Sequence, residues 1–416
     1  MQTTGLIVEY NPFHNGHNYH LNRSKTITDN QPVIAIMSGN FTQRGEPAIF
    51  DKWIRTKMAA KAGIDLVIEL PVSYAIRSAE YFARGAILSL AYTGLVNKIV
   101  FGSEKGQLEI LQYIASLLVS EPPEFQRKLK SYLNNGLSFP EARAEAIRKL
   151  LGEDAFKAIN QPNNILGIEY LKAIKEYELP IQAETIERKD SNYHDKSPGQ
   201  SDIASATAIR NLVYKNQIET ALKYIPEFNQ DLFKSTINSN QGPANQDTWA
   251  VYTLFKIRSL TKTELLDVPA ISANLANSIL SYRNEITNYH DLIASLTSKT
   301  YPKSRVARAL LQATLRLSSS KYKEHNLESP AYLRILAIGE KGKSILSELS
   351  SKSKVPVIIQ PAEYLDEPDF NSSDKLKYQL SLDIHASNLY SLIIPNKSAR
   401  TGNRDFTERL IDLKDL

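Results

Sequence analysis

The chain has 416 residues with ordinary hydrophobic (42%) and charged (23%) fractions, so it can bury full cores in two or three domains. It contains no cysteine, which excludes disulfides, thiolate zinc sites and cysteine nucleophiles, and no apolar run approaches the roughly 20 residues of a membrane helix. We therefore expect a cytoplasmic protein with no membrane partner, and the net charge of +5 permits a nucleic-acid partner without arguing strongly for one.

The first predicted strand, Leu6 to Val8, ends at an Asn-Pro pair, and a helix is predicted to open near Gly16. Three of the seven histidines, His14, His17 and His20, lie within seven residues at this junction. The free N–H groups of a helix N-terminus attract anions, and both His14 and His17 can donate an N–H to a phosphate oxygen. The pattern predicts a nucleotide-phosphate site in which these two histidines are catalytic. A zinc site on the three histidines and a merely structural turn are the alternatives.

Strands and helices then alternate through the N-terminal half of the chain. Strands rich in Val and Ile are predicted at residues 32–37, 66–70, 98–101 and 181–186. Helices are predicted at residues 51–62 and 78–92 and from residue 162 onward, with a charged helical insertion at about 121–157. This alternation predicts an α/β fold with a Rossmann-like parallel sheet covered by helices on both faces.

Ligands of such sheets bind beyond the carboxyl ends of the strands, where three loops should meet: the histidine loop, the polar loop Ser38–Pro47 and the turn Gly102–Glu104. The backbone of Ser38-Gly39-Asn40 is expected to line the pocket and Arg44 to meet phosphate, while Asp51-Lys52 brings both charges near the site. The glycine of the turn suits close approach of an adenine or a ribose. The alternative for the loop Ser38–Pro47 is a flexible polar connection, and the alternative for Gly102 is a helix cap.

A second phosphate-binding helix is predicted further along the chain. The Asn163-Asn164 pair either caps the helix that starts near residue 162 or contacts the nucleotide. After the polar stretch Lys189 to Gln200, which we expect to be mobile, a capped helix offers the hydroxyls of Ser205 and Thr207 with Arg210 to a phosphate. The alternative is an ordinary capped helix with an arginine in solvent.

The C-terminal half is predicted to be mainly helical, with a small α/β element built on strands at 333–338 and 355–359. Gly-Lys-Ser at residues 342–344 is not a P-loop, because Ala337 stands where that motif needs glycine. The last residues, 396–416, are polar, and we expect them to be partly mobile. Basic side chains that could follow a phosphate backbone, or merely a solvated helix face, are Lys303, Arg305, Arg308, Arg316, Lys321 and Lys323.

Taken in order, these motifs resemble those of the bacterial tRNA(Met) cytidine acetate ligases, which have the H-x-G-H signature of the nucleotidyltransferase superfamily. The resemblance rests on G-L-I-V-E-Y-N-P-F-H-N-G-H (5–17), S-G-N-F-T-Q-R-G-E-P-A (38–48), D-K-W-I-R (51–55), D-L-V-I-E-L-P (65–71), F-G-S-E (101–104) and P-N-N-I-L-G-I-E-Y (162–170). The I-S-S-T-x-I-R signature is matched less closely, because Ala206 separates Ser205 from Thr207.

The resemblance implies a HIGH-type, ATP-binding catalytic domain, which we expect at residues 1–215, and it favours tRNA binding by the mainly helical region 216–416. Within that region, the basic pattern predicts RNA contacts from Lys303, Arg305 and Arg308. The resemblance also implies that acetate and ATP, with Mg²⁺, give acetyl-adenylate and pyrophosphate, and that the acetyl group passes to N4 of the wobble cytidine of elongator tRNA(Met). The implied ATP-binding residues are Ile7, Val8, Glu9, Tyr10, Asn11, Pro12, Phe13, His14, Asn15, Gly16, His17, Asn18, Tyr19, His20, Gly102, Asn163 or Asn164, and Arg188.

Two other functions compete with this interpretation. The first is adenylation of a small cofactor precursor, and the second is a non-catalytic RNA-binding protein on a vestigial nucleotide fold. No carboxylate pair indicates a dedicated metal cage, so no metal ligand is predicted. The sequence leaves open which group accepts the proton of the cytidine amine.

Overall fold

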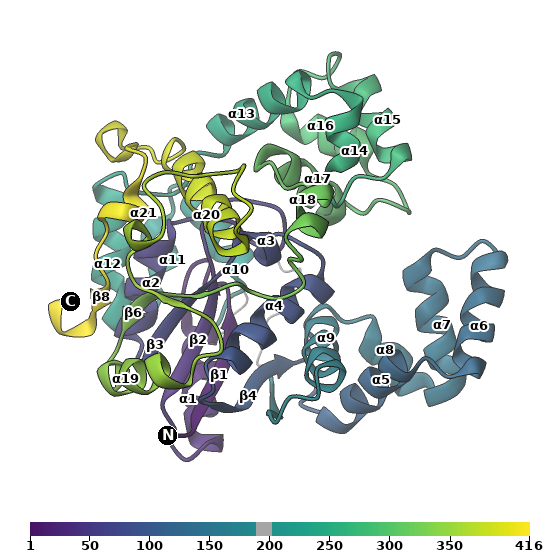
Figure 1. Ribbon diagram of the computed structural model, residues 1–416, viewed down its shortest axis with the longest axis horizontal. Coiled ribbons are helices and arrows are strands. Elements are labelled where there is room, and N and C mark those ends of the chain that lie inside the picture. The colour runs from purple at the N-terminus through teal and green to yellow at the C-terminus, as the bar shows by residue number, and fades with distance from the viewer. Residues whose placement is uncertain (189–201) are drawn as a thin grey trace.

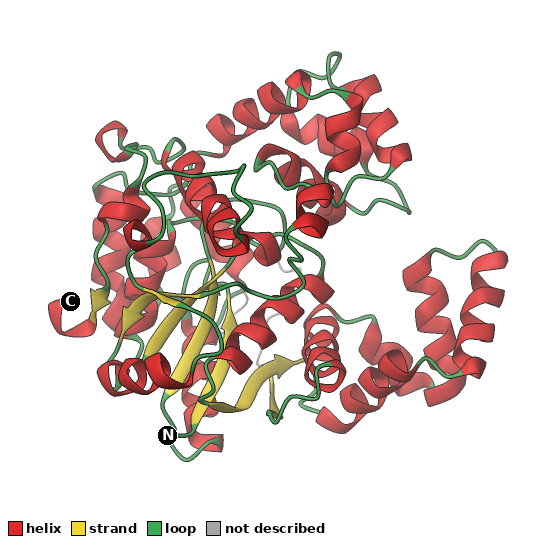
Figure 2. Ribbon diagram, in the orientation of Figure 1, coloured by secondary structure: helices red, strands yellow, loops and turns green. Residues whose placement is uncertain are grey.

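The computed structural model describes residues 1–188 and 202–416, so the stretch Lys189 to Gln200 lies outside the described residues. The described strands form one eight-stranded sheet in the order β5-β4-β1-β2-β3-β6-β7, with β8 paired to β6 (Figure 2). The strands are β1 (Thr3–Val8), β2 (Val33–Ser38), β3 (Leu66–Leu70), β4 (Val96–Ser103), β5 (Gln182–Glu187), β6 (Leu333–Ile338), β7 (Val357–Ile358) and β8 (Ile411–Asp412).

Helices cover this sheet and extend away from it on one side (Figure 1). Those up to β5 are α1 (Asn15–Ile27), α2 (Lys52–Lys61), α3 (Val72–Ala75), α4 (Ala79–Tyr92), α5 (Leu108–Ser120), α6 (Pro123–Asn134), α7 (Phe139–Leu151), α8 (Glu153–Ile159) and α9 (Pro162–Glu176). Those that follow are α10 (Ala206–Tyr214), α11 (Ile218–Leu222), α12 (Glu227–Asn238), α13 (Gln246–Ser259), α14 (Lys262–Asp267), α15 (Ala273–Tyr282), α16 (Tyr289–Leu296), α17 (Lys303–Thr314), α18 (Ser319–Glu324), α19 (Gly342–Lys352), α20 (Lys375–Ser391) and α21 (Arg404–Thr407). The helical insertion predicted at residues 121–157 is formed by α6, α7 and α8.

The predicted parallel α/β sheet is confirmed for the first five strands. β1 pairs in parallel with β2 and β4, β2 with β3, and β4 with β5. Along β2, Ile34 and Ile36 pack into the core on one face, whereas Val33, Ala35 and Met37 pack into the core on the other. A strand buried on both faces is apolar along most of its length, which explains the hydrophobic run from Val33 to Met37.

The small C-terminal α/β element is not a separate body, because its strands extend the main sheet. β6 pairs with the edge of β3 in antiparallel register, and β7 and β8 both pair with β6. All five residues of β3 are buried, so this pairing covers a strand edge that would otherwise be open. Beyond residue 215, α12 also packs on α2, although the boundary between two domains there stays a prediction.

Helices α13 to α17 form a further hydrophobic core, separate from the two that flank the sheet (Figure 1). Ile257, Leu275, Leu292 and Leu310 are fully buried in it. The second turn of α17 meets the main body at Gly45, whose backbone has φ +86°. A Cβ atom there would lie 2.4 Å from the backbone nitrogen of Arg308, so only glycine allows this approach.

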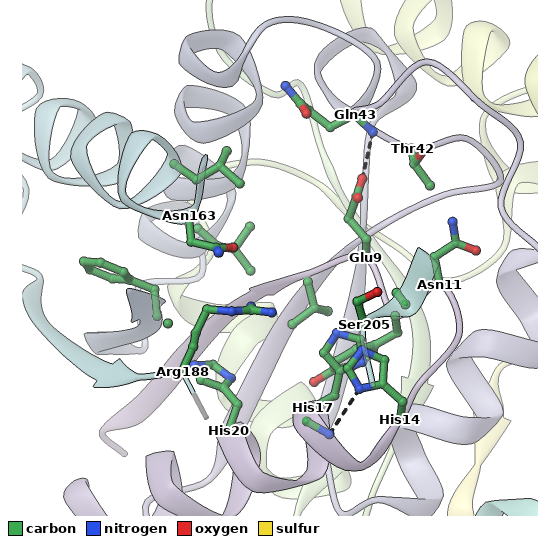
Figure 3. A pocket seen from close by; sticks show the side chains of 18 of the residues that line it. Glu9, Asn11, His14, His17, His20, Thr42, Gln43, Asn163, Arg188 and Ser205 are labelled. Carbon is green, nitrogen blue, oxygen red and sulfur yellow. Dashed lines mark hydrogen bonds between the residues drawn. The ribbon is translucent and has the colours of Figure 1, made fainter. Parts of the chain in front are cut away.

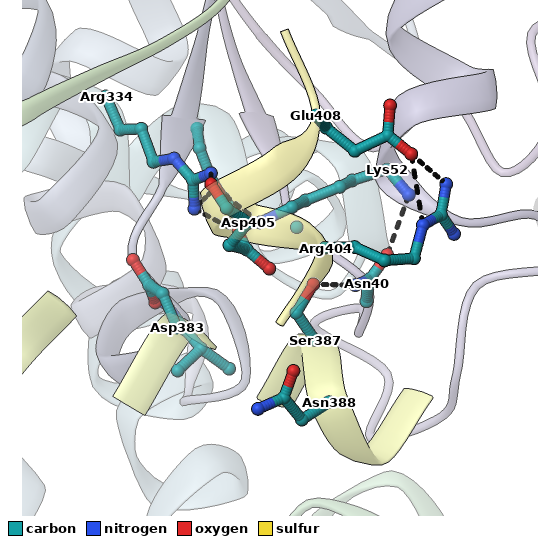
Figure 4. Close-up of polar contacts among 12 residues, drawn as sticks. Asn40, Lys52, Arg334, Asp383, Ser387, Asn388, Arg404, Asp405 and Glu408 are labelled. Carbon is teal, nitrogen blue, oxygen red and sulfur yellow. Dashed lines mark hydrogen bonds and ion pairs between the residues drawn. The ribbon is translucent and has the colours of Figure 1, made fainter. Parts of the chain in front are cut away.

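Residues 396–416 are not a loose tail, contrary to the prediction from their polarity. Asp405, in α21, is fully buried beside Lys52 and Arg334 (Figure 4). β8 adds a strand to the sheet a few residues later. Local composition could not show this, because the partners of Asp405 lie far away in the sequence.

Candidate functional site

A cavity of about 240 Å³ lies beside the carboxyl ends of β1, β4 and β5. Predicted site residues on its lining are Ile7, Val8, Glu9, Tyr10, Asn11, His14, Gly16, His17, Tyr19, His20, Arg44, Gly102, Asn163, Arg188, Ser205, Thr207 and Arg210. Predicted site residues that do not line it are Pro12, Phe13, Asn15, Asn18 and Asn164. The topology therefore brings together segments that are about 200 positions apart in the sequence.

The two signature histidines form one stacked unit at the start of α1 (Figure 3). Their ring centroids are 3.7 Å apart, and Nδ1 of His14 accepts a hydrogen bond from the Gly16 N–H at 3.1 Å. An accepting Nδ1 places the proton of the neutral His14 ring on Nε2, where it can be donated to a ligand. Tyr10, with a left-handed φ of +46°, turns the chain after β1 and packs its ring edge-on against His17.

The histidine rings are neutral before a ligand arrives. Burial, followed by the positive charges of Arg188 and Arg210, lowers the pKa of His14 to about 3. Burial, followed by the neighbouring His14, lowers the pKa of His17 well below its usual range. Burial and Arg188 lower the pKa of His20 to about 4. Neutral N–H donors next to arginines suit a polyanion, whose charge would raise these pKa values again.

The second predicted phosphate-binding helix faces the same cavity. Ser205 caps α10 by accepting from the N–H of Ala208 at 3.1 Å. The Thr207 hydroxyl accepts from Arg44 at 3.0 Å and from Arg210 at 3.4 Å. Arg210 also binds the carboxylate of Glu46 at 3.1 Å. The predicted group of Arg44, Ser205, Thr207 and Arg210 is therefore assembled on the cavity wall.

The asparagine pair does not cap its helix. Gln161 is the N-cap of α9, and the carboxylate of Glu104 accepts from the backbone N–H groups of Asn163 and Asn164, each at 3.1 Å. Asn163 lines the cavity, whereas Asn164 is buried and bonds to Gln161. The geometry thus favours Asn163 over Asn164 as a ligand contact.

Several charged and polar groups predicted near the pocket are used by the fold instead. Within Ser38–Asn40, the carbonyls of the first two residues accept from the buried guanidinium of Arg55, and the segment does not line the cavity. Asp51 caps α2, accepting from the backbone N–H of Ile54 at 2.8 Å. Lys52 is fully buried and bonds to Glu69 at 2.8 Å. Their charges are paired within the fold, so they do not reach the ligand.

Sequence reasoning missed Thr42, Gln43 and Glu46 as individual lining residues, although it identified the polar loop that contains them. It also missed an aromatic wall, where Phe101 and Tyr170 pack edge-on with centroids 5.8 Å apart. The sequence did contain a signal for this wall, since Phe101 lies near the end of β4 and directly before Gly102. An apolar wall beside a glycine suits the face of a nucleobase.

In the described part of the chain, no group of three or more His, Cys, Asp or Glu side chains could hold a metal ion, so the zinc alternative gains no support. No described helix is long and apolar enough to cross a membrane.

Lys303 and Arg305 are exposed on the first turn of α17, outside the cavity. Arg308, one turn later, donates to the Gln43 carbonyl at 3.4 Å. The predicted RNA contacts therefore begin next to the loop that lines the cavity.

Comparison with known proteins agrees with this geometry. Residues 1–405 match the HIGH Nucleotidyl Transferase family. The tRNA(Met) cytidine acetate ligase of Halothermothrix orenii is 39% identical in an alignment 415 positions long, which covers 98% of this chain and 98% of that protein. The chain belongs to the tRNA(Met) cytidine acetate ligase family. The family's enzyme from Thermoanaerobacter is 40% identical over 99% of this chain and 100% of its own length.

Solved structures of this ligase family share the whole fold. The crystal structure of Thermotoga maritima TmcAL bound with alpha-thio ATP has a TM-score of 0.91 and 34% sequence identity, and covers 99% of each chain. The apo form of the same protein gives a TM-score of 0.93, also at 34% identity, over 99% of this chain and 100% of that one. The HIGH-type nucleotidyltransferase fold and the family resemblance are thus confirmed.

Proposed function

We propose that the chain is an ATP-dependent ligase that acetylates N4 of the wobble cytidine of elongator tRNA(Met), through acetyl-adenylate. The observation that carries this proposal is the meeting of the His14–His17 pair with Arg44 and Arg210 in one cavity. Its membership in the tRNA(Met) cytidine acetate ligase family supports the choice of acetate and tRNA as substrates. Because tRNA is the acceptor, the reaction takes place in the cytoplasm.

In the first step, an oxygen of acetate attacks the α-phosphorus of ATP, and the bond to pyrophosphate breaks. The Nε2 proton of His14 and the His17 ring stabilise the charge that develops on the phosphate oxygens. Arg210 and Arg44 hold the departing pyrophosphate, and the N-termini of α1 and α10 add their dipoles. Mg²⁺ bound to the ATP phosphates would neutralise part of their negative charge, and the described residues form no group of three or more His, Cys, Asp or Glu side chains that could hold it.

The nucleoside of ATP lies toward β4 and β5 in this proposal. Gly102 and Phe101 give the base a close and apolar surface, while Asn163 and Arg188 supply polar contacts at its edge. Asn163 is fixed for this role, because both its backbone N–H and its side-chain amide donate to Glu104 at 3.1 Å. His20, one turn beyond His17, closes the same side of the cavity.

The purified protein is tested with ATP, radiolabelled acetate and total tRNA, followed by nucleoside analysis, with controls that lack ATP or RNA. We expect label in N4-acetylcytidine only when ATP is present, together with acetate-dependent release of pyrophosphate. If neither label in RNA nor acetate-dependent pyrophosphate release is found, the proposal is wrong, and adenylation of a cofactor precursor becomes the better assignment.

A variant in which Lys303, Arg305 and Arg308 are all replaced by glutamine is expected to bind tRNA at least about ten-fold more weakly at physiological salt. The slope of log affinity against log salt concentration should be shallower by about two to three, since each phosphate contact contributes about 0.9 to that slope. Acetate-dependent pyrophosphate exchange should persist. Binding measured by filter retention checks this, with Lys128→Gln on the distant α6 as the control. Unchanged affinity and slope would show that this helix face is only solvated.

A further inference from the structure

The second step of the proposed reaction needs a group that accepts a proton from the N4 amine of cytidine. Glu9 lies directly after β1, and its side chain lines the cavity (Figure 3). One oxygen, Oε1, accepts from the backbone N–H of Gln43 at 2.7 Å. Among the described residues, the other oxygen, Oε2, has no hydrogen-bond partner. Glu9 is thus a carboxylate held in place by one oxygen, with the other available to a ligand.

Of the other carboxylates on the described lining of the cavity, one is already in an ion pair and one is exposed to solvent. Glu46 is bound by the guanidinium of Arg210 at 3.1 Å, where it balances the charge meant for phosphate. Glu187 ends β5 and is exposed to solvent. Glu9 differs from both because it is partly enclosed and has no ion-pair partner within 4 Å among the described cations.

The histidines are poor candidates for the same task. Nδ1 of His14 already accepts from Gly16, and its ring is stacked on that of His17. Their N–H groups are needed to donate to the α-phosphate throughout the reaction. A base that took up a proton here would place a new positive charge between Arg188 and Arg210, which burial already opposes.

The surroundings of Glu9 strengthen it as a base. Burial raises the pKa of the Glu9 carboxyl, and the nearby Glu46 on the polar loop adds to this. The Gln43 N–H and the charges of Arg44 on the loop and Arg55 on α2 act in the opposite direction, and burial outweighs them. A carboxylate with a raised pKa holds a transferred proton better than one in water.

We propose that Glu9 is the general base of acetyl transfer, taking the N4 proton of cytidine on Oε2. This inference rests on the proposed function. The N4 nitrogen attacks the carbonyl carbon of acetyl-adenylate and forms the C–N bond. The bond from that carbon to the phosphate oxygen breaks, and AMP leaves with the electron pair. The proton lost by nitrogen moves to Glu9 and returns to solvent after the products leave.

The variant Glu9→Gln tests proton transfer without removing the hydrogen bond that Glu9 makes in the structure. A glutamine side-chain oxygen can still accept from the Gln43 N–H, so the polar loop stays anchored, but the amide cannot take up a proton. The reaction starts from chemically synthesised acetyl-adenylate and tRNA in a single turnover, so that adenylation is bypassed. We expect the transfer rate to fall at least about 100-fold, while acetate-dependent pyrophosphate exchange falls far less.

The pH profile gives a readout that a purely positioning role would not move. In the wild type, transfer from acetyl-adenylate should slow as pH falls and Glu9 becomes protonated. In Glu9→Gln this acid limb should be absent. The control is Glu184→Gln on β5, which removes a carboxylate that lies outside the cavity and pairs with Lys98. Its pH profile should match that of the wild type.

Two results would overturn the assignment of Glu9 while leaving the proposed function intact. In one, Glu9→Gln transfers the acetyl group at the wild-type rate. In the other, exchange and transfer fall by the same factor, which would make Glu9 a group that positions ATP. If the wild-type protein itself transfers nothing from acetyl-adenylate to tRNA, the proposed function fails instead.

Discussion

Replacing His17 by alanine is expected to lower acetate-dependent pyrophosphate exchange by about 100- to 1,000-fold, the cost of losing one donor to a developing anion. The ring of His17 stacks on His14 at 3.7 Å and packs against Tyr10 at 4.9 Å. Alanine therefore removes a donor and also frees the His14 ring to leave its position. Exchange is measured with labelled pyrophosphate, and the affinity for tRNA is measured on the same preparation.

tRNA binding by this variant should stay close to that of the wild type, because α17 lies outside the cavity. The control is His290→Ala, which removes an exposed histidine of α16 and should affect neither measurement. An equal loss of exchange and tRNA binding in His17→Ala would contradict the proposed separation between an ATP cavity and an RNA-binding helix. Exchange at the wild-type level would remove His17 from the first step.

The histidine site was predictable because its residues are contiguous and their roles depend on local geometry. His14, Gly16 and the start of α1 are within one turn of each other, so strand, turn and helix signals agree. The convergence of the polar loop and of α10 on this point follows from parallel topology, in which strand ends meet at one edge. These parts needed no knowledge of distant contacts.

What the sequence did not reveal depends on partners far along the chain. Asparagines near a helix start are usual caps, yet Glu104, about 60 residues earlier, takes that place at α9. Lys52 looks like a surface lysine next to the pocket, but its partner Asp405 is 353 residues away. Whether such a charge faces a ligand or is paired inside the core depends on how the sheet is assembled.

The pairing of β6 with β3 also joins residues far apart in the sequence, and it brings buried charges together. Arg334, on β6, enters the interior opposite Glu69 of β3, so a cation from the C-terminal half meets an anion from the N-terminal half. Lys52 bonds both oxygens of Glu69 and, at 2.5 Å, Asp405, which also pairs with Arg334 (Figure 4). Two cations and two anions are thus balanced in a buried cluster that holds α21 against the sheet.

Asp405→Asn is expected to lower the free energy of unfolding by about 3–5 kcal/mol, because it leaves two buried cations facing one carboxylate. The side chain keeps its shape, so the loss comes from charge rather than from a cavity. The nearby Asp383 replaces little of the lost negative charge, since burial and the charge of Glu69 raise its pKa to about 7. Urea unfolding followed by tryptophan fluorescence measures the change, because the buried Trp53 ring lies 5.3 Å from the Lys52 ammonium.

The matched control is Asp412→Asn in the same C-terminal segment, which weakens a partly exposed ion pair with Lys343. It should cost less than about 1 kcal/mol, as exposed pairs do. Adding salt should reduce that small effect and leave the effect of Asp405→Asn nearly unchanged, because a buried cluster is poorly screened. Equal effects of the two substitutions would mean that α21 contributes no more to the sheet than an ordinary surface segment, and that the cluster is not what fixes the C-terminal end of the chain.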